Sequence, residues 1–253
     1  MKHILILTIL LSIISPLAIA GPQHWGFGMS YLATIEIRGD KNQLVVYEAP
    51  LRAKNAVWIS RWVDESEHYA NIVPGCLAGG NFWHGDFGKD YLVAIEKEGD
   101  KYILRVLEPP EVFGTMPWKI VSSTALESKT APIAATAGDL LGAKSDQLLL
   151  LRKDDKGYFV EILKPPAKPE EKWEPAIKKA VLPLQTISIN GFACGDFWDE
   201  NKDYVVISDI SDKLNLHYYA FEDSVFKLIT SEKQNINLSN PVFTIFGPIA
   251  ADY

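Results

Sequence analysis

Residues 91–110 read YLVAIEKEGDKYILRVLEPP, two runs rich in Val, Ile, Leu and Tyr that are joined at Gly99–Asp100. Runs of this composition favour β-strands, and a Gly-Asp pair between them favours a tight turn. The segment is therefore predicted to form a β-hairpin. The pattern returns at YLATIEIRGDKNQLVVYEAP from Tyr31, at QLLLLRKDDKGYFVEILKPP from Gln147 and, more loosely, at YVVISDISDKLNLHYYAF from Tyr204. The starts are 60, 56 and 57 residues apart, which indicates a repeat of about 57 residues.

Two further strand-like segments flank each hairpin. An aromatic residue opens the downstream segment, at Trp58, Trp118, Trp173 and Phe226. A small, apolar segment precedes the hairpin: PGCLAGGNFW from Pro74, PIAATAGDLL from Pro132, NGFACGDFW from Asn190 and FGPIAADY from Phe246. Four strands per repeat without helical periodicity are typical of a β-propeller blade, and small residues suit the innermost strand, where blades crowd around the axis. A β-sandwich is the main alternative, but it does not require the motif to return four times.

The repeats predict one all-β propeller domain at 21–253, which follows a predicted signal peptide at 1–20. Its repeats fall approximately at 30–73, 74–131, 132–189 and 190–245, followed by a last strand at 246–253. In this register the mature chain begins with the second strand of its first blade, and 246–253 corresponds to an innermost strand. Two architectures remain open. Either that strand completes the first blade and closes a ring of four blades, which removes exposed sheet edges, or it begins a fifth blade of a longer propeller.

The first twenty residues, MKHILILTILLSIISPLAIA, have a basic start, an apolar stretch and a small-x-small end. This pattern predicts a secretory signal peptide cut after Ala20, and hence a secreted or periplasmic protein. A membrane anchor is the alternative, but the apolar run is barely long enough to span a bilayer, and no later segment is. With only Cys76 and Cys194, a disulfide framework cannot hold the fold together, and two buried thiols are favoured over a bridge.

The segments GNFWHGDFGKDYLV from Gly80, AGDLLGAKSDQLLL from Ala137 and CGDFWDENKDYVVI from Cys194 resemble the FG-GAP or VCBS repeats of extracellular β-propellers, which are related to the integrin α-chain head. The resemblance covers most of the chain after residue 20. It implies a Gly-Asp-Phe turn followed by an Asp/Asn/Gly loop that often binds calcium and closes with an Asp. The opening matches at Asp139 and Asp196, and the closing Asp matches at Asp90, Asp146 and Asp203.

The interiors of these loops depart from the family pattern. Calcium requires about six to eight oxygen ligands. The resemblance gives the fourth repeat a candidate calcium site at Asp196, Asp199, Glu200, Asn201 and Asp203, although Trp198 stands where a ligand is expected. The second repeat offers Asn81, Asp86 and Asp90, and the interior of the third has no carboxylate. The alternative is that Asp139 and Asp196 cap their own turns, which Asp does readily, and on this alternative no cofactor is needed.

No nucleophile-elbow, phosphate-loop or zinc motif occurs, and the His residues show no metal-ligand spacing. Equivalent positions converge around a propeller axis, however, so Asp86, Asp139, Asp196 and Asp252 could form a ring of carboxylates at one channel mouth, with His84 near it. Paired carboxylates are what glycoside cleavage requires. An extracellular polysaccharide-degrading enzyme that uses Asp139 and Asp196 is therefore the alternative to a non-catalytic protein.

Loop tryptophans are the other candidate binding groups. Trp83 and Trp198 occupy matching places and, with Asp86, are the predicted ligand-binding residues, because Trp stacks on sugars and anchors protein partners. Packing between blades is the alternative for both tryptophans. Nucleic acid is excluded as a partner, since 25 basic residues against 32 acidic ones, without a basic run, offer nothing to a phosphate backbone. The sequence thus predicts an exported, non-catalytic propeller that acts as a binding or scaffold module for a glycan or protein.

Overall fold

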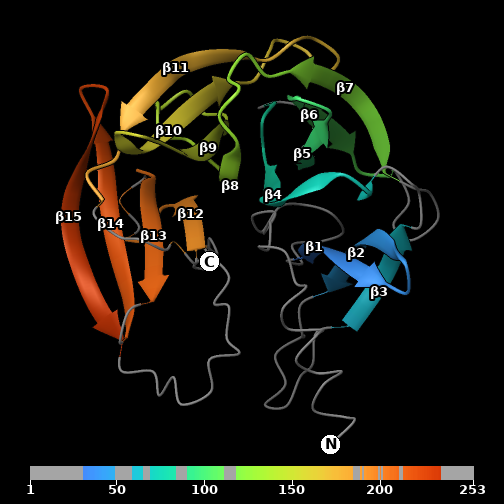
Figure 1. Cartoon of the computed structure of the whole chain (residues 1–253), viewed down its shortest axis with the longest axis horizontal. Coiled ribbons are helices and arrows are strands. Elements are labelled where there is room, and N and C mark those ends of the chain that lie inside the picture. Colours follow the sequence, from blue (N-terminus) through green and yellow to red (C-terminus); the bar gives the residue numbers. More distant parts are fainter. Residues whose placement is uncertain are drawn as a thin grey trace, which may run out of the picture.

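The computed structural model describes residues 31–48, 59–64, 69–83, 90–110, 118–184, 189, 191–198, 200, 202–210 and 213–234. These residues form an all-β protein whose antiparallel sheets are arranged as a four-bladed β-propeller (Figure 1), so the predicted fold class is confirmed. The predicted signal peptide at 1–20 and the last predicted strand at 246–253 lie outside the described residues.

Each blade is a meander of consecutive antiparallel strands. Blade 1 contains β1 (Tyr31–Arg38), β2 (Lys41–Glu48) and β3 (Ile59–Asp64). Blade 2 contains β4 (Ile72–Gly80), β5 (Tyr91–Glu98), β6 (Lys101–Glu108) and β7 (Lys119–Ala125). Blade 3 contains β8 (Pro132–Gly138), β9 (Gln147–Asp154), β10 (Gly157–Lys164) and β11 (Glu174–Val181). Blade 4 contains β12 (Gly191–Gly195), β13 (Tyr204–Ile210), β14 (Leu214–Glu222) and β15 (Val225–Gln234).

The small-residue strands β4, β8 and β12 lie nearest the centre of the ring, and β7, β11 and β15 form its rim (Figure 1). Strand β8 packs beside both β4 and β12. Within the described residues blade 1 lacks such an innermost strand. The predicted hairpins are present, and Gly39 and Gly99 turn two of them with φ of +70° and +58°, a conformation that favours glycine.

The strands that follow the innermost strands, β5, β9 and β13, are buried on both faces for most of their length. In β5, Val93 and Ile95 join a core shared with Leu148 of blade 3, whereas Leu92 and Ala94 join the core shared with blade 1. A strand between two neighbouring blades needs apolar residues on both faces, which is why these strands read as nearly continuous apolar runs.

The aromatic residue that recurs before or within the outer strand fills the seam to the preceding blade. Trp118, Trp173 and Phe226 are all buried, in the cores between blades 1 and 2, 2 and 3, and 3 and 4. The backbone N–H of Trp118 donates to Asp64 Oδ2 (3.2 Å) and that of Trp173 to Thr124 Oγ1 (3.2 Å). These residues therefore join each blade to the one before it. Trp58 lies outside the described residues.

The two cysteines are separate, buried thiols. Cys76 lies in β4 and Cys194 in β12, and neither forms a disulfide. Burial raises the pKa of the Cys76 thiol to about 12, so it stays protonated at neutral pH. In the part of the chain that the structure describes, no helix has the length and apolarity needed to cross a membrane.

Candidate functional site

The loops that the sequence singled out follow the innermost strands. They span 81–90, 139–146 and 196–203, and they lie where β4, β8 and β12 end and where β5, β9 and β13 begin. This end of the propeller is called the loop end below. Because strands alternate in direction, the connections β6–β7, β10–β11 and β14–β15 also lie there.

In the loops 139–146 and 196–203, the closing Asp reaches back to the preceding blade. Asp146 Oδ2 accepts a hydrogen bond from the Asn81 N–H (2.7 Å), and Asp203 Oδ2 accepts one from the Asp139 N–H (2.5 Å). A Cβ atom on Gly80 would lie 2.7 Å from Asp146 Oδ2. The glycine of the repeated motif is therefore the residue that lets the next blade's carboxylate approach the backbone.

Asp139 organises its own loop. Its Oδ1 accepts from the Ala143 N–H (2.7 Å) and the Gln147 side-chain amide (3.1 Å), and its Oδ2 accepts from the Lys144 N–H (2.7 Å). Lys144 has φ of +62°, which places its N–H in reach of the carboxylate. Both oxygens of the predicted catalytic Asp139 are thus occupied by hydrogen bonds from its own loop.

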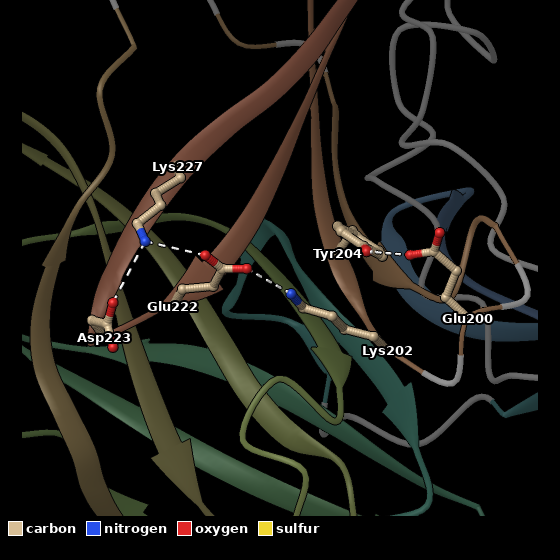
Figure 2. A network of polar contacts seen from close by, with 6 residues as sticks. All are labelled: Glu200, Lys202, Tyr204, Glu222, Asp223 and Lys227. Atoms are coloured by element: carbon tan, nitrogen blue, oxygen red, sulfur yellow. Dashed lines mark hydrogen bonds and ion pairs between the residues drawn. The ribbon is translucent and has the colours of Figure 1, made fainter.

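Asp196 and Glu200 have comparable roles in blade 4. Asp196 Oδ1 accepts from the backbone N–H groups of Trp198 (3.3 Å) and Glu200 (3.0 Å). Glu200 Oε2 accepts from the Tyr204 hydroxyl (2.5 Å; Figure 2), and this hydrogen bond raises the pKa of Tyr204 to about 12.

The described part of the fourth loop contains three of the five predicted calcium ligands, Asp196, Glu200 and Asp203. Among the described residues, no three His, Cys, Asp or Glu side chains are placed to hold a metal ion. Asp199 and Asn201, two of the five predicted ligands in the fourth loop, lie outside the described residues, as does Asp86. The calcium site therefore stays a prediction, while the described carboxylates make the hydrogen bonds expected of turn caps.

Trp83 joins blade 2 to blade 3. Its Nε1 donates to the Pro166 carbonyl (2.8 Å), and its ring packs edge-on against Tyr91 (4.7 Å between centroids) and Trp173 (5.9 Å). The indole is half-buried. Most of its contact surface is therefore already used within the propeller.

Trp198 holds the same position in blade 4. It packs edge-on against Tyr204 (4.5 Å), as Trp83 does against Tyr91, and contacts Tyr218 (5.1 Å). The side chain is 40% exposed.

Leu141 is the corresponding residue of blade 3, and it is also 40% exposed. Its neighbour Leu140 packs with Phe221 against the core between blades 3 and 4. In the preceding seam, the β10–β11 connection at 165–173 covers Trp83 through Pro166. In blade 4 the matching connection is only the turn Asp223–Ser224, with φ of +53° and +65°. Among the described residues, blade 4 therefore has no connection comparable to 165–173 next to Leu141.

Charged side chains surround the short turn of blade 4. Glu222 pairs with Lys202 (2.9 Å) and with Lys227 (3.1 Å), and Lys227 also approaches Asp223 (3.5 Å; Figure 2). All four side chains are exposed. We call Leu141 together with these four residues the open seam. The sequence analysis missed the open seam because it selected tryptophans and acidic residues as candidates. The feature that marks the open seam in the sequence is the short connection before Phe226.

The sequence analysis also did not single out the charged residue at the sixth position of β1, β5, β9 and β13. The four residues are Glu36, Glu96, Arg152 and Asp209. Each has a partner within its own blade, as in the fully buried Arg152 with Glu161 (2.8 Å) and in Asp209 with His217 (2.6 Å). The aligned repeats display this position, but hydrophobic patterning alone does not mark it.

The described residues also enclose a polar crevice of about 260 Å³ between the outer strands of blades 2 and 3. Its lining includes Glu127, Glu161, Lys172, Trp173 and Lys178. An ion pair between Lys178 and Glu127 (3.0 Å) crosses from one blade to the other there. These contacts tie the two blades together at the rim.

No protein-family model and no curated protein matches the chain. The resemblance of its loops to FG-GAP or VCBS repeats consequently remains a prediction that rests on the quoted residues alone.

Proposed function

We propose that the chain is an exported, non-catalytic propeller that binds a protein ligand at the open seam between blades 3 and 4. The observation that carries this proposal is Leu141, which is 40% exposed at the one described seam where the covering connection is reduced to two residues. Leu141 is an exposed aliphatic side chain of blade 3, and exposed lysines and carboxylates surround the short turn of blade 4. An apolar centre with a polar rim is the arrangement of a protein interface.

A protein is favoured over the glycan that the sequence also predicts. Sugar binding generally uses an open aromatic face, and the exposed indole of Trp198 already contacts Tyr204 and Tyr218. None of the five residues of the open seam is aromatic, and the nearby Tyr204 ring is covered by Lys202 (5.4 Å). Its charges of both signs suit a protein surface, where charge complementarity selects the partner.

The carboxylate enzyme is less well supported. A general acid or nucleophile must present an oxygen to its substrate. Asp139 instead accepts three hydrogen bonds from its own loop, and Asp196 accepts two. These carboxylates are held toward the backbone of their own loops.

The test uses photo-crosslinking on the protein as it is exported. The photoreactive residue p-benzoylphenylalanine is placed at position 141 and, as a control, at Ile133, which is 37% exposed at the opposite end of β8. We expect position 141 to crosslink to one defined exported protein and position 133 not to do so. With that protein purified, Leu141→Asp should weaken binding at least tenfold, and Ile133→Asp should not.

Two results would overturn the proposal. The first is the same crosslinking pattern from both positions, or binding of arrayed glycans that Leu141→Asp does not affect. The second is hydrolysis of a polysaccharide that Asp139→Asn abolishes while the variant retains the wild-type circular dichroism spectrum, since that would show a catalytic carboxylate.

A further inference from the structure

The wall of the crevice between blades 2 and 3 contains two buried polar groups without a partner. Glu161 is 4% exposed; its Oε2 accepts a hydrogen bond from Arg152 Nε (2.8 Å), whereas its Oε1 makes no hydrogen bond within the described residues. The indole Nε1 of Trp173, which is 2% exposed, has no partner there either. The wall therefore offers an open acceptor and an open donor, and such groups are costly to bury unless something binds them.

Blades 2 and 4 complete the position that corresponds to Glu161 with a serine. Arg105 lies opposite Ala94 of β5 and opposite Ser123 of β7, and its Nη1 donates to the Ser123 Oγ (2.5 Å). His217 has the same register in blade 4, and its Nδ1 lies 2.9 Å from the Ser231 Oγ. In both blades a hydroxyl on the outer strand thus contacts the charged or titratable residue of the third strand.

Blade 3 lacks that hydroxyl. Glu161 lies opposite the fourth residue of β9, as Arg105 and His217 lie opposite the fourth residues of β5 and β13. The pairing of β10 with β11 shifts register at this point, so no residue of β11 lies opposite Glu161. The charges are also reversed, because the cation Arg152 lies on the second strand and the carboxylate on the third. Glu161 instead lines the crevice, and the group that completes this position must donate a hydrogen bond to a carboxylate.

Charges of both signs surround the crevice, and they balance. Three cations, of which Arg152 lies behind Glu161, stand against three carboxylates: Arg152, Lys172 and Lys178 against Glu127, Glu161 and Glu174. A ligand with a net charge would disturb this balance, whereas a zwitterion keeps it. Lys178 already pairs with Glu127 (3.0 Å), but Lys172 is exposed and forms no ion pair within the described residues. Lys172 is therefore the cation that is available to a ligand carboxylate.

The volume of about 260 Å³ restricts the ligand to a small molecule, since pockets for drug-sized ligands measure roughly 300–1,000 Å³. We propose that the crevice binds a small zwitterion, a free amino acid, whose ammonium group donates to Glu161 Oε1 and whose carboxylate accepts from the Trp173 indole and pairs with Lys172. An ammonium group is preferred to a hydroxyl, because charge-assisted hydrogen bonds are stronger than neutral ones. This site lies in a different seam from Leu141, and the inference does not depend on the proposed function.

NMR of the tryptophan indole N–H groups in the full chain tests the site. The probes are glycine, 3-aminopropanoate and 4-aminobutanoate, which differ only in the distance between ammonium and carboxylate. We expect at least one of them to shift the signal that Trp173→Phe removes, and to do so saturably. Propanoate, which lacks the ammonium group, and glycerol, which is neutral, should bind at least about tenfold more weakly. The absence of a saturable shift with all three probes, or an equal affinity for glycerol, would overturn the inference.

Substitutions around the crevice test the individual contacts. Arg152→Leu with Glu161→Leu removes the buried ion pair as a unit, so it should abolish binding while the circular dichroism spectrum is retained. Lys172→Gln should weaken binding about two- to fivefold, and Lys168→Gln, in the same connection but outside the crevice, should not.

A third variant does not depend on the folding of the double variant. Ala125 is exposed in the crevice wall, so Ala125→Trp should block the crevice without altering the buried ion pair. Unchanged binding by Ala125→Trp, or by the folded double variant, would show that the amino acid binds elsewhere and would overturn the inference.

Discussion

Substituting Gly138 by alanine tests the packing of the seam between blades 3 and 4. The backbone of Gly138 is outside the left-handed region, so alanine meets no conformational barrier there. The new methyl group would overlap Cys194 Sγ and lie 3.0 Å from Cys194 Cβ and 2.7 Å from Asp203 Oδ2. Carbon atoms in contact prefer about 3.5–4 Å, so β8 and β12 must separate by roughly half an ångström to 1 Å.

The expected change in the free energy of unfolding is the sum of two destabilising effects and one stabilising effect. Overpacking in a core costs about 1–3 kcal/mol. The Asp203 carboxylate is displaced from the Asp139 N–H, which costs about 1 kcal/mol more. Alanine is better than glycine within a strand by about 0.5–1 kcal/mol. We therefore expect Gly138→Ala to lower the free energy of unfolding by about 2 kcal/mol.

Urea unfolding of the protein, with and without Cys194→Gly, measures this effect. Cys194→Gly removes the atoms that the methyl group meets, so the double variant should recover about 1–2 kcal/mol relative to the sum of the single changes. Gly142→Ala is the control, because its cost comes from a φ of +65° with no atom within 4 Å of the added Cβ. Cys194→Gly should not reduce the destabilisation caused by Gly142→Ala. Equal losses from Gly138→Ala in both backgrounds would refute the steric argument.

Four further outcomes are expected. Arg152→Leu should lower the free energy of unfolding by about 3–5 kcal/mol because it strands the buried Glu161 carboxylate, and adding Glu161→Leu should restore much of the loss in the same urea assay. Glu200→Gln should lower the pKa of Tyr204 from about 12 toward 10, which NMR of ring-labelled tyrosine detects. In the unchanged protein, the hydrogen bond between Tyr204 and Glu200 should be lost only as the pH rises from 10 to 12. Burial and the nearby Asp146 raise the pKa of Asp90 to about 8, so the folded state keeps a proton that the unfolded chain loses above about pH 4; the urea midpoint should therefore fall between pH 5 and 8, and Asp90→Asn should lessen that fall. Calcium and a chelator should leave the thermal midpoint unchanged in differential scanning calorimetry, since the described loop carboxylates already accept hydrogen bonds from their own chain.

The fold could be predicted because a propeller repeats its physical constraints in every blade. Each hairpin must have apolar residues on both faces, and each outer strand must begin near an aromatic residue that fills the seam. These requirements appear in the sequence as the aligned runs from Tyr91 and Gln147 and as Trp118 and Trp173, all of which the structure places in the cores between blades. Only local composition was needed to find them.

The candidate site was less accessible to this reasoning because it depends on what a neighbouring blade provides. Trp83 and Leu141 occupy the same place in their repeats, yet one is half-buried and the other exposed. The difference arises in the following blade, where a connection that carries Pro166 is present in one case and reduced to Asp223–Ser224 in the other. Inspection of the residue itself cannot reveal a difference that is made by a segment some eighty residues further along.

The opening Gly-Asp and the closing Asp of these loops join neighbouring blades by hydrogen bonds that do not involve a metal. The opening glycine gives the next blade access to the backbone, and the closing Asp of that blade, Asp146 or Asp203, occupies the space. The opening Asp139 fixes the loop between them. A loop interior such as 141–145 can therefore lose every carboxylate without loss of the contact between blades. The same argument predicts which changes are tolerated: substitutions inside the loop should alter the surface at the loop end, whereas those at its first and last residues should open a seam.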